Sequence, residues 1–160
     1  KKKKNKCMRL STNLTQEELK KSQTATRKGL ENTPGPEHLE SAKALFENVV
    51  QKVRDNFGVT VINSGYRGPA LNEAVGGSSR SQHCKGEAVD IECPGTGNYD
   101  VAKWISENCD FDQLILEFYT PGIPDSGWVH VSYKSEGNRK SILTAMKENG
   151  KTVYKAGLIQ

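Results

Sequence analysis

Apolar residues recur at helical spacing through one long segment of the chain, Glu37–Asn56. Apolar residues mostly three or four positions apart form a stripe along one face of a helix. Here they are Leu39, Ala42, Leu45, Val49, Val50 and Val53. The breaker cluster Asn32–Pro36 precedes this segment and Gly58 follows it, as expected at the two ends of a helix. The pattern predicts the long helix of the domain, packed by one face against a sheet.

Shorter helices are predicted on either side of that segment. Thr15 and Glu18 form a capping-box pattern, which indicates a short helix near the start of the chain. Pro69–Val75 has room for one helical turn. Tyr99–Asn108 has the spacing of a further helix, with Val101, Trp104 and Ile105 facing inwards.

Strand patterns dominate the second half of the chain. Short β-branched or alternating runs occur at Val59–Ile62, Glu87–Glu92, Leu114–Phe118, Trp128–Tyr133, Lys140–Met146 and Thr152–Tyr154. The Asn149-Gly150 pair between the last two runs is a strong hairpin signal. Helices come early and strands late, without alternation of strand and helix. We therefore expect an α+β fold: a mostly antiparallel sheet with a long N-terminal helix and short helices.

Composition and charge set the domain organisation. With 160 residues the chain has the size of one domain, and much of its net charge of +4 lies in the lysine-rich run 1–6. We expect residues 1–13 to form a basic disordered tail and residues 14–160 a single domain. The alternative for the tail is a weak attraction to anionic polymers such as cell-wall polymers or nucleic acid. We expect a monomer with no nucleic-acid partner.

Neither a membrane segment nor a secretion signal is visible. No apolar stretch approaches membrane-spanning length, so we expect no membrane insertion. The basic start is not followed by the apolar segment of a signal peptide. The four cysteines (Cys7, Cys84, Cys93 and Cys109) lack paired metal-ligand spacing. Free thiols in a reducing cytoplasm are the expected state, and in an extended stretch Cys84 would face away from its neighbour His83.

Three side chains carry the candidate chemistry. His83 and Asp90 lie seven positions apart, before and within a strand-like run, and His130 lies in another such run. Two imidazoles and one carboxylate make a three-ligand zinc set, in which a catalytic zinc keeps its fourth position open for water. Taken alone, His83 could equally be an exposed loop histidine and Asp90 a turn acceptor.

The order of residues around these ligands is more specific. Ser81-Gln-His83, Gly86, Ala88-Val-Asp90 and Trp128-Val-His130 resemble the zinc D-alanyl-D-alanine carboxypeptidases, especially the small phage and bacterial cell-wall peptidases. Further similarities are Ser22-Gln-Thr-Ala25, Ser64-Gly-Tyr-Arg67, Leu71-Asn72, Val75-Gly-Gly77 and Phe111-Asp-Gln-Leu-Ile115. The resemblance implies the fold shared by these peptidases and the hedgehog signalling domain. It also implies that His83, Asp90 and His130 bind Zn²⁺.

The resemblance assigns further roles around the metal. Arg67 matches an arginine that faces substrate, where a guanidinium can hold a carboxylate or carbonyl through paired hydrogen bonds. Ser81 and Gln82 are expected to shape the loop or orient the ligands, and with Trp128 to contact substrate.

The general base is the position at which the sequence departs from the family. Many relatives carry an acidic residue three positions before the second histidine, and here that residue is Gly127. Glu117, in an otherwise apolar strand, and Asp125, in a turn-like loop, are the two remaining candidates. We favour Glu117, because an ionised carboxylate in such a strand is costly unless a cation compensates it.

These inferences together predict a zinc metallopeptidase that cuts peptidoglycan stem peptides or cross-links, as a phage endolysin does. Its synthesis would be cytoplasmic in the host, and it would act on the cell wall after release or as a virion component. The alternatives are a non-catalytic zinc-binding recognition module and a structural component of a phage particle.

Overall fold

The computed structural model describes residues 9–20, 32, 34–76 and 81–159. The strands are β1 (Arg9–Ser11), β2 (Leu14–Thr15), β3 (Val61–Ser64), β4 (Ala88–Glu92), β5 (Gln113–Glu117), β6 (Trp128–Ser132), β7 (Ser141–Glu148) and β8 (Lys151–Ala156). The helical elements are α1 (Gln16–Lys20), α3 (Pro36–Leu45), η2 (Phe46–Val50), α4 (Gln51–Phe57), α5 (Pro69–Ala74), η3 (Gln82–Lys85) and α6 (Asn98–Asn108).

A six-stranded sheet in the order β3-β4-β6-β5-β7-β8 forms the frame of the molecule. Every neighbouring pair is antiparallel except β5 and β7, which are parallel. The α+β class with a mostly antiparallel sheet is thereby confirmed, although the sheet as a whole is mixed. A separate two-stranded sheet of β1 and β2 lies near the start of the described chain.

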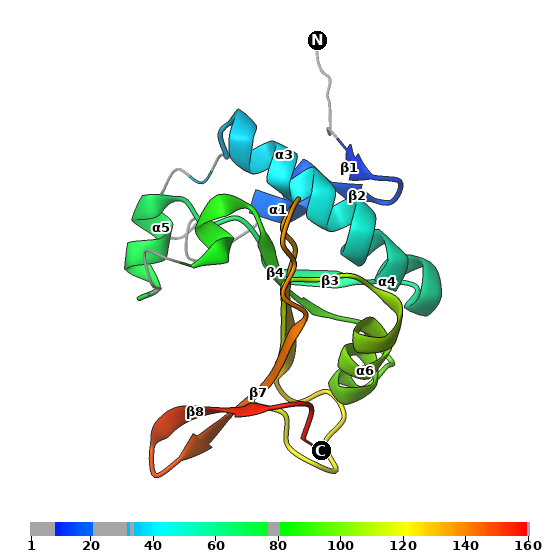
Figure 1. The fold of residues 1–160 in the computed structure, drawn as a ribbon, viewed down its shortest axis with the longest axis vertical. Helices are drawn as coiled ribbons and strands as arrows, with labels where there is room; N and C mark the ends of the chain where they lie inside the picture. The colour runs from blue at the N-terminus through cyan, green and yellow to red at the C-terminus, as the bar shows by residue number, and fades with distance from the viewer. Residues whose placement is uncertain (1–8, 21–31, 33, 77–80, 160) are drawn as a thin grey trace.

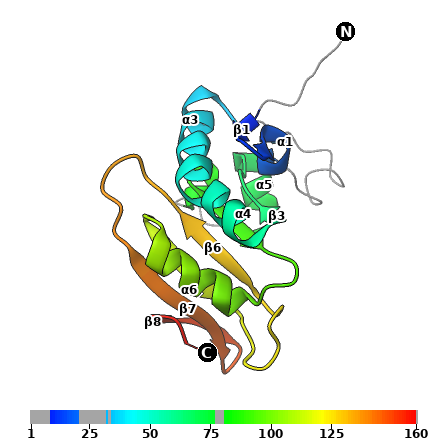
Figure 2. The ribbon, with the colours of Figure 1, turned by 90° about the vertical axis from the view of Figure 1, so that its right-hand side faces the viewer.

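The two faces of the large sheet differ in polarity because side chains alternate along each strand. Val89 and Ile91 of β4, Val129 and Val131 of β6, and Leu114 and Leu116 of β5 point to one face and are fully buried. The helices α3, α4 and α6 cover that face (Figures 1 and 2). The alternate residues, which include Asp90, Glu117 and His130, share the opposite face.

The predicted long N-terminal helix needs a correction. The helical run begins at Pro36, after β1, β2 and α1, and it consists of α3, the π-helical segment η2 and α4. The wider turn is closed by the Gln51 amide, which donates to the carbonyl of Phe46 five residues earlier. The run ends at Gly58, whose φ of 87° lies in the left-handed region. Apolar periodicity located this helix, but periodicity does not report how hydrogen bonds shift within one.

Several local predictions are confirmed. The Thr15 hydroxyl accepts from the Glu18 amide (3.3 Å), and the Glu18 carboxylate accepts from the Thr15 amide (3.1 Å), so the capping box is formed. Asn149 and Gly150 both have positive φ in the β7–β8 hairpin. Val101 and Ile105 of α6 are fully buried, and Trp104 is partly buried against the core.

The expected basic tail is described only in part. Arg9–Ser11 forms β1, and Leu10 is buried in the core, so this part of residues 1–13 is ordered. Residues 1–8, the Ser22–Ala25 motif and the Gly77 end of the Val75 motif lie outside the described residues. The extent of the domain stays a prediction. Cys84, Cys93 and Cys109 are free thiols, and within the described ranges no helix is long and apolar enough to cross a membrane.

Candidate metal centre and active site

His83 is held by the short helix η3, which begins immediately after Ser81. The Ser81 hydroxyl caps this helix by accepting from the His83 amide (3.2 Å). The imidazole is 2% exposed, and its Nδ1 lies 2.8 Å from the carbonyl oxygen of Gly65. A carbonyl oxygen can only accept, so Nδ1 carries a proton and Nε2 is the ring nitrogen that faces the site. This arrangement is typical of a metal-binding histidine oriented by a backbone carbonyl.

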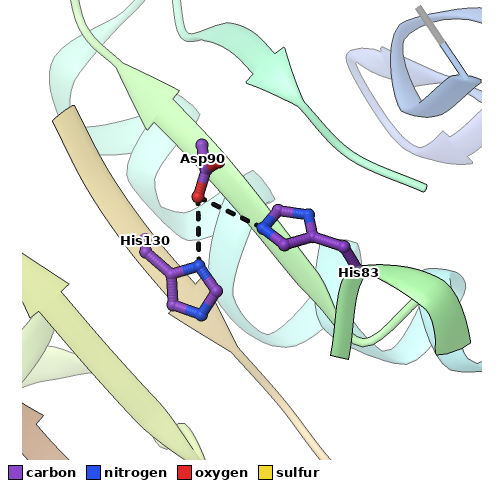
Figure 3. A group of neighbouring side chains, drawn as sticks. All are labelled: His83, Asp90 and His130. Atoms are coloured by element: carbon purple, nitrogen blue, oxygen red, sulfur yellow. Dashed lines mark hydrogen bonds and ion pairs between the residues drawn. The ribbon is translucent and has the colours of Figure 1, made fainter. Parts of the chain in front are cut away.

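Asp90 and His130 are direct neighbours across the sheet. Asp90 of β4 pairs with His130 of β6 in the antiparallel register, so both side chains leave the sheet on the same face. Figure 3 shows the Asp90 carboxylate between the two imidazoles. Its Oδ1 lies 3.0 Å from Nδ1 of His130 and 3.3 Å from Nε2 of His83. Pairing of β4 with β6 therefore brings together residues forty positions apart.

The charge and burial of His83, Asp90 and His130 favour the binding of a cation. Burial raises the pKa of Asp90, but hydrogen bonds and charge from His130 and His83 outweigh it and hold that pKa well below its ordinary value. Asp90 is therefore an anion at neutral pH. A largely buried carboxylate within about 3.3 Å of nitrogens from two imidazoles is an arrangement that a shared cation stabilises.

The spacing of the donor atoms fits zinc. Ligand atoms from His83, Asp90 and His130 all lie within 4.8 Å of one another. Tetrahedral zinc with bonds of 2.0–2.1 Å needs ligand atoms about 3.3 Å apart, close to the two contacts that Asp90 makes. Cys84 does not belong to this group of ligand atoms. The extended stretch on which its expected orientation was based is wrong, because Gln82–Lys85 forms the 3₁₀ helix η3.

The trio lies in a groove of about 720 Å³ on the open face of the sheet. Glu117, Trp128 and Arg67 also line it. Glu117 of β5 pairs with Trp128 of β6, the strand that also carries His130. Oε2 of Glu117 accepts a hydrogen bond from the Trp128 indole (2.9 Å). Burial and the charge of Asp90 raise the pKa of Glu117, while His130, the indole bond and Arg67 act in the opposite direction.

The second candidate base lies elsewhere. Asp125 is exposed in the loop between β5 and β6 and does not line the groove. Gly127 has a structural reason to be glycine: its φ is 65°, and a Cβ there would overlap the carbonyl oxygen of Glu117. The chain cannot carry an acidic side chain at position 127 without moving the strand that holds Glu117.

Arg67 lines the groove beside the candidate metal ligands. Its backbone amide donates to the His83 carbonyl (3.0 Å), and its Nη2 donates to the Ser81 hydroxyl (3.3 Å). Its Nε is buried and has no hydrogen-bond partner in the described part of the chain. A buried guanidinium donor without a partner is costly unless a ligand supplies an acceptor.

Sequence reasoning missed a polar network at the other end of the groove. Asp112 is fully buried, and its carboxylate accepts from the Arg139 Nε (3.0 Å), Nη2 (2.8 Å) and backbone amide (3.1 Å). Gln82, expected to orient the site, donates to the same carboxylate (3.0 Å) and links it to the turn of His83. These hydrogen bonds hold the pKa of Asp112 at about 2, against the raising effect of burial. An acidic residue between Phe111 and the apolar run of β5 was the available signal.

Comparison with known proteins identifies the family. The family model described as Peptidase M15 matches residues 12–132, a segment that contains all three candidate ligands, Arg67 and Glu117. No curated protein matches the sequence significantly.

Proposed function

The chain belongs to the peptidase M15 family, which is of the zinc D-Ala-D-Ala carboxypeptidase type, and from this premise we propose a function. We propose that the protein is a zinc metallopeptidase that hydrolyses peptide bonds in peptidoglycan stem peptides or cross-links. The observation that carries the proposal is the convergence of His83, Asp90 and His130 in an open groove that also contains Glu117.

The three ligands have separate tasks in this proposal. His83 offers Nε2, because its Nδ1 is committed to Gly65, and His130 and Asp90 offer the atoms that already face each other. Bound zinc would supply Lewis-acid chemistry, polarising the scissile carbonyl and acidifying a water molecule. The sheet pairing of Asp90 with His130 orients two of the three donors before any ion binds.

Glu117 is the proposed general base. One of its oxygens is occupied by the Trp128 indole, which leaves the other to take a proton from the attacking water and to deliver it to the leaving amine. Its place in the groove, in the strand next to His130, supports this role over Asp125.

Arg67 is the proposed substrate clamp. Its buried Nε lacks a partner and its Nη2 is steadied by Ser81, so the planar guanidinium is oriented before substrate arrives. Such a group can hold a substrate carboxylate or the oxyanion that develops at the scissile carbonyl. Trp128 and Ser81 complete the proposed contact surface for substrate.

The biological setting that we propose is cell-wall lysis or remodelling in the manner of a phage endolysin, with the protein acting as a monomer. A non-catalytic recognition module is the alternative, and turnover separates the two.

The test is digestion of purified peptidoglycan by the full chain, with and without one equivalent of Zn²⁺, followed by mass spectrometry of the new amino and carboxyl termini. We expect zinc-dependent release of peptides and one zinc bound per chain. His83→Ala and His130→Ala should each lose tight zinc binding and activity. His38→Ala is the matched control, since the third histidine of the chain contacts the Tyr66 ring and lies outside the groove. Stoichiometric zinc binding without any cleavage would transfer support to the recognition module.

A further inference from the structure

Three cationic side chains gather at the end of the groove away from Glu117. Lys85, Lys134 and Arg139 line this end. Lys85 precedes β4 and Lys134 follows β6, and these antiparallel strands pair from Ala88–Ser132 to Ile91–Val129. Lys85 and Lys134 therefore lie beyond the same end of the paired strands. Arg139 reaches that end through Asp112, the residue that precedes β5.

The segment that carries Lys134 and Arg139 is fastened at two points. The Asn138 side chain accepts from the backbone amide of Lys134 and donates to its carbonyl, both at 2.8 Å. Arg139 is fixed by its three hydrogen bonds to the buried Asp112. These contacts hold Lys134 and Arg139 at the groove before any ligand binds.

The charges at this end do not cancel. Two carboxylates line this end of the groove beside the three cations: Asp112, which is paired with Arg139, and Glu87, which accepts from the Gln82 amide (3.4 Å). Asp110 and Glu136 are close in sequence, but both are exposed and do not line the groove. Within the residues that the structure describes, neither Lys85 nor Lys134 has an ion-pair partner. Arg139 keeps 56% of its side chain exposed and can donate to a second acceptor. The lining of the groove at this end thus carries three cations against two carboxylates, a net charge of one positive unit, which suits an anionic group of the ligand.

We propose that Lys85, Lys134 and Arg139 form a carboxylate subsite, and that the substrate is a peptide with a free carboxylate at this distance from the cleaved bond. This inference rests on the proposed peptidase function and narrows its substrate class. Lys134 is four positions beyond His130, and a strand rises about 3.3 Å per residue, so the subsite lies up to roughly 13 Å from His130 along the strand. About four residues of extended peptide span that separation.

The carboxylate can belong to an acidic side chain or to the C-terminus of the substrate. The experiment therefore uses one peptidoglycan stem peptide in three forms: unmodified, with its side-chain carboxylates amidated, and with its C-terminus amidated. The zinc-loaded full chain is compared with the double variant Lys85→Met/Lys134→Met. Arg139 is left intact because it also neutralises the buried Asp112. The control is the double variant Lys43→Met/Lys103→Met, which removes the same two charges from α3 and α6 on the covered face of the sheet.

We expect the double variant to raise KM for the unmodified peptide about 10-fold and to leave kcat unchanged. The reason is that the subsite would bind the substrate equally well in the ground state and in the transition state. One of the two amidated peptides should show the same increase in the parent and no further increase in the double variant. That peptide identifies the source of the carboxylate. Lys134→Arg, which keeps the charge, should retain most of the affinity.

Equal KM for all three peptides in the parent would overturn the subsite while leaving the peptidase function intact. If no peptide is cleaved, Kd values measured by isothermal titration calorimetry decide instead. A lysine-dependent preference for the free carboxylate would then sustain the subsite and reject the catalytic proposal. Absence of binding, or equal Kd values for all three forms, would overturn the subsite as well.

Discussion

We expect Asp112→Asn to destabilise the folded protein. The Asp112 carboxylate is fully buried and accepts four hydrogen bonds, three from Arg139 and one from Gln82. An asparagine of the same size loses the charge, and its amide nitrogen would face donors of Arg139 or Gln82. Buried donors would then lack acceptors, which is the costly outcome.

The pKa of Asp112 sets the magnitude. It falls from 3.8 to about 2 in the folded protein, chiefly because of Arg139, and this difference corresponds to about 2 kcal/mol of stability at neutral pH. For a domain of this size, we expect a decrease in Tm of about 4–8 °C. Because the folded pKa is lower than the unfolded one, the stabilisation is complete above about pH 5 and is lost as the pH falls toward 2.

Urea unfolding followed by circular dichroism provides the assay. At pH 7 the parent should exceed Asp112→Asn by about 2 kcal/mol in unfolding free energy, and by pH 3 that gap should narrow by about 1 kcal/mol. Asp110→Asn is the matched control, because this exposed neighbour accepts only one long contact, at 3.5 Å from Asn138. If Asp112→Asn and Asp110→Asn unfold at the same urea concentration, the buried network contributes nothing and the reasoning is refuted.

The remaining predictions concern the groove. Glu117→Gln should still bind zinc, but its rate of peptidoglycan hydrolysis should fall by about 10²–10⁴-fold. Asp125→Asn should lose less activity, and the reverse order would assign the role of general base to Asp125. Arg67→Lys should retain zinc, as measured by metal analysis, but lose most of its peptidase activity, because an ammonium group cannot reproduce the paired hydrogen bonds of the planar guanidinium. Unchanged turnover would show that Arg67 is only a surface residue. Gly127→Ala should lower the unfolding free energy by about 2–4 kcal/mol in urea titrations, because position 127 has a positive φ and a Cβ there would overlap the Glu117 carbonyl. An unchanged urea midpoint would show that the loop adapts freely.

Local patterns in the sequence determined most of the secondary structure. Helix and strand positions follow from the spacing of apolar residues, and the Thr15–Glu18 cap and the Asn149-Gly150 turn follow from the chemistry of single residues. The three candidate metal ligands were likewise recognisable, since their order along the chain resembles that of a known family. The helix, strand, cap and turn signals depend on a few neighbouring residues, and the order of the ligands depends on the sequence alone, so both can be read before the chain is folded.

Only the tertiary structure decided which distant groups share the groove. Glu117 and Asp125 were nearly equal candidates in sequence, and the pairing of β5 with β6 puts Glu117 beside Trp128 while Asp125 stays in an exposed loop. Arg139 joins Asp112 across twenty-seven positions, a contact that no local pattern encodes. A shift of one residue in the register of β5 or β6 would turn Glu117 or Trp128 to the opposite face of the sheet. Non-local packing sets that register, and with it the composition of the site.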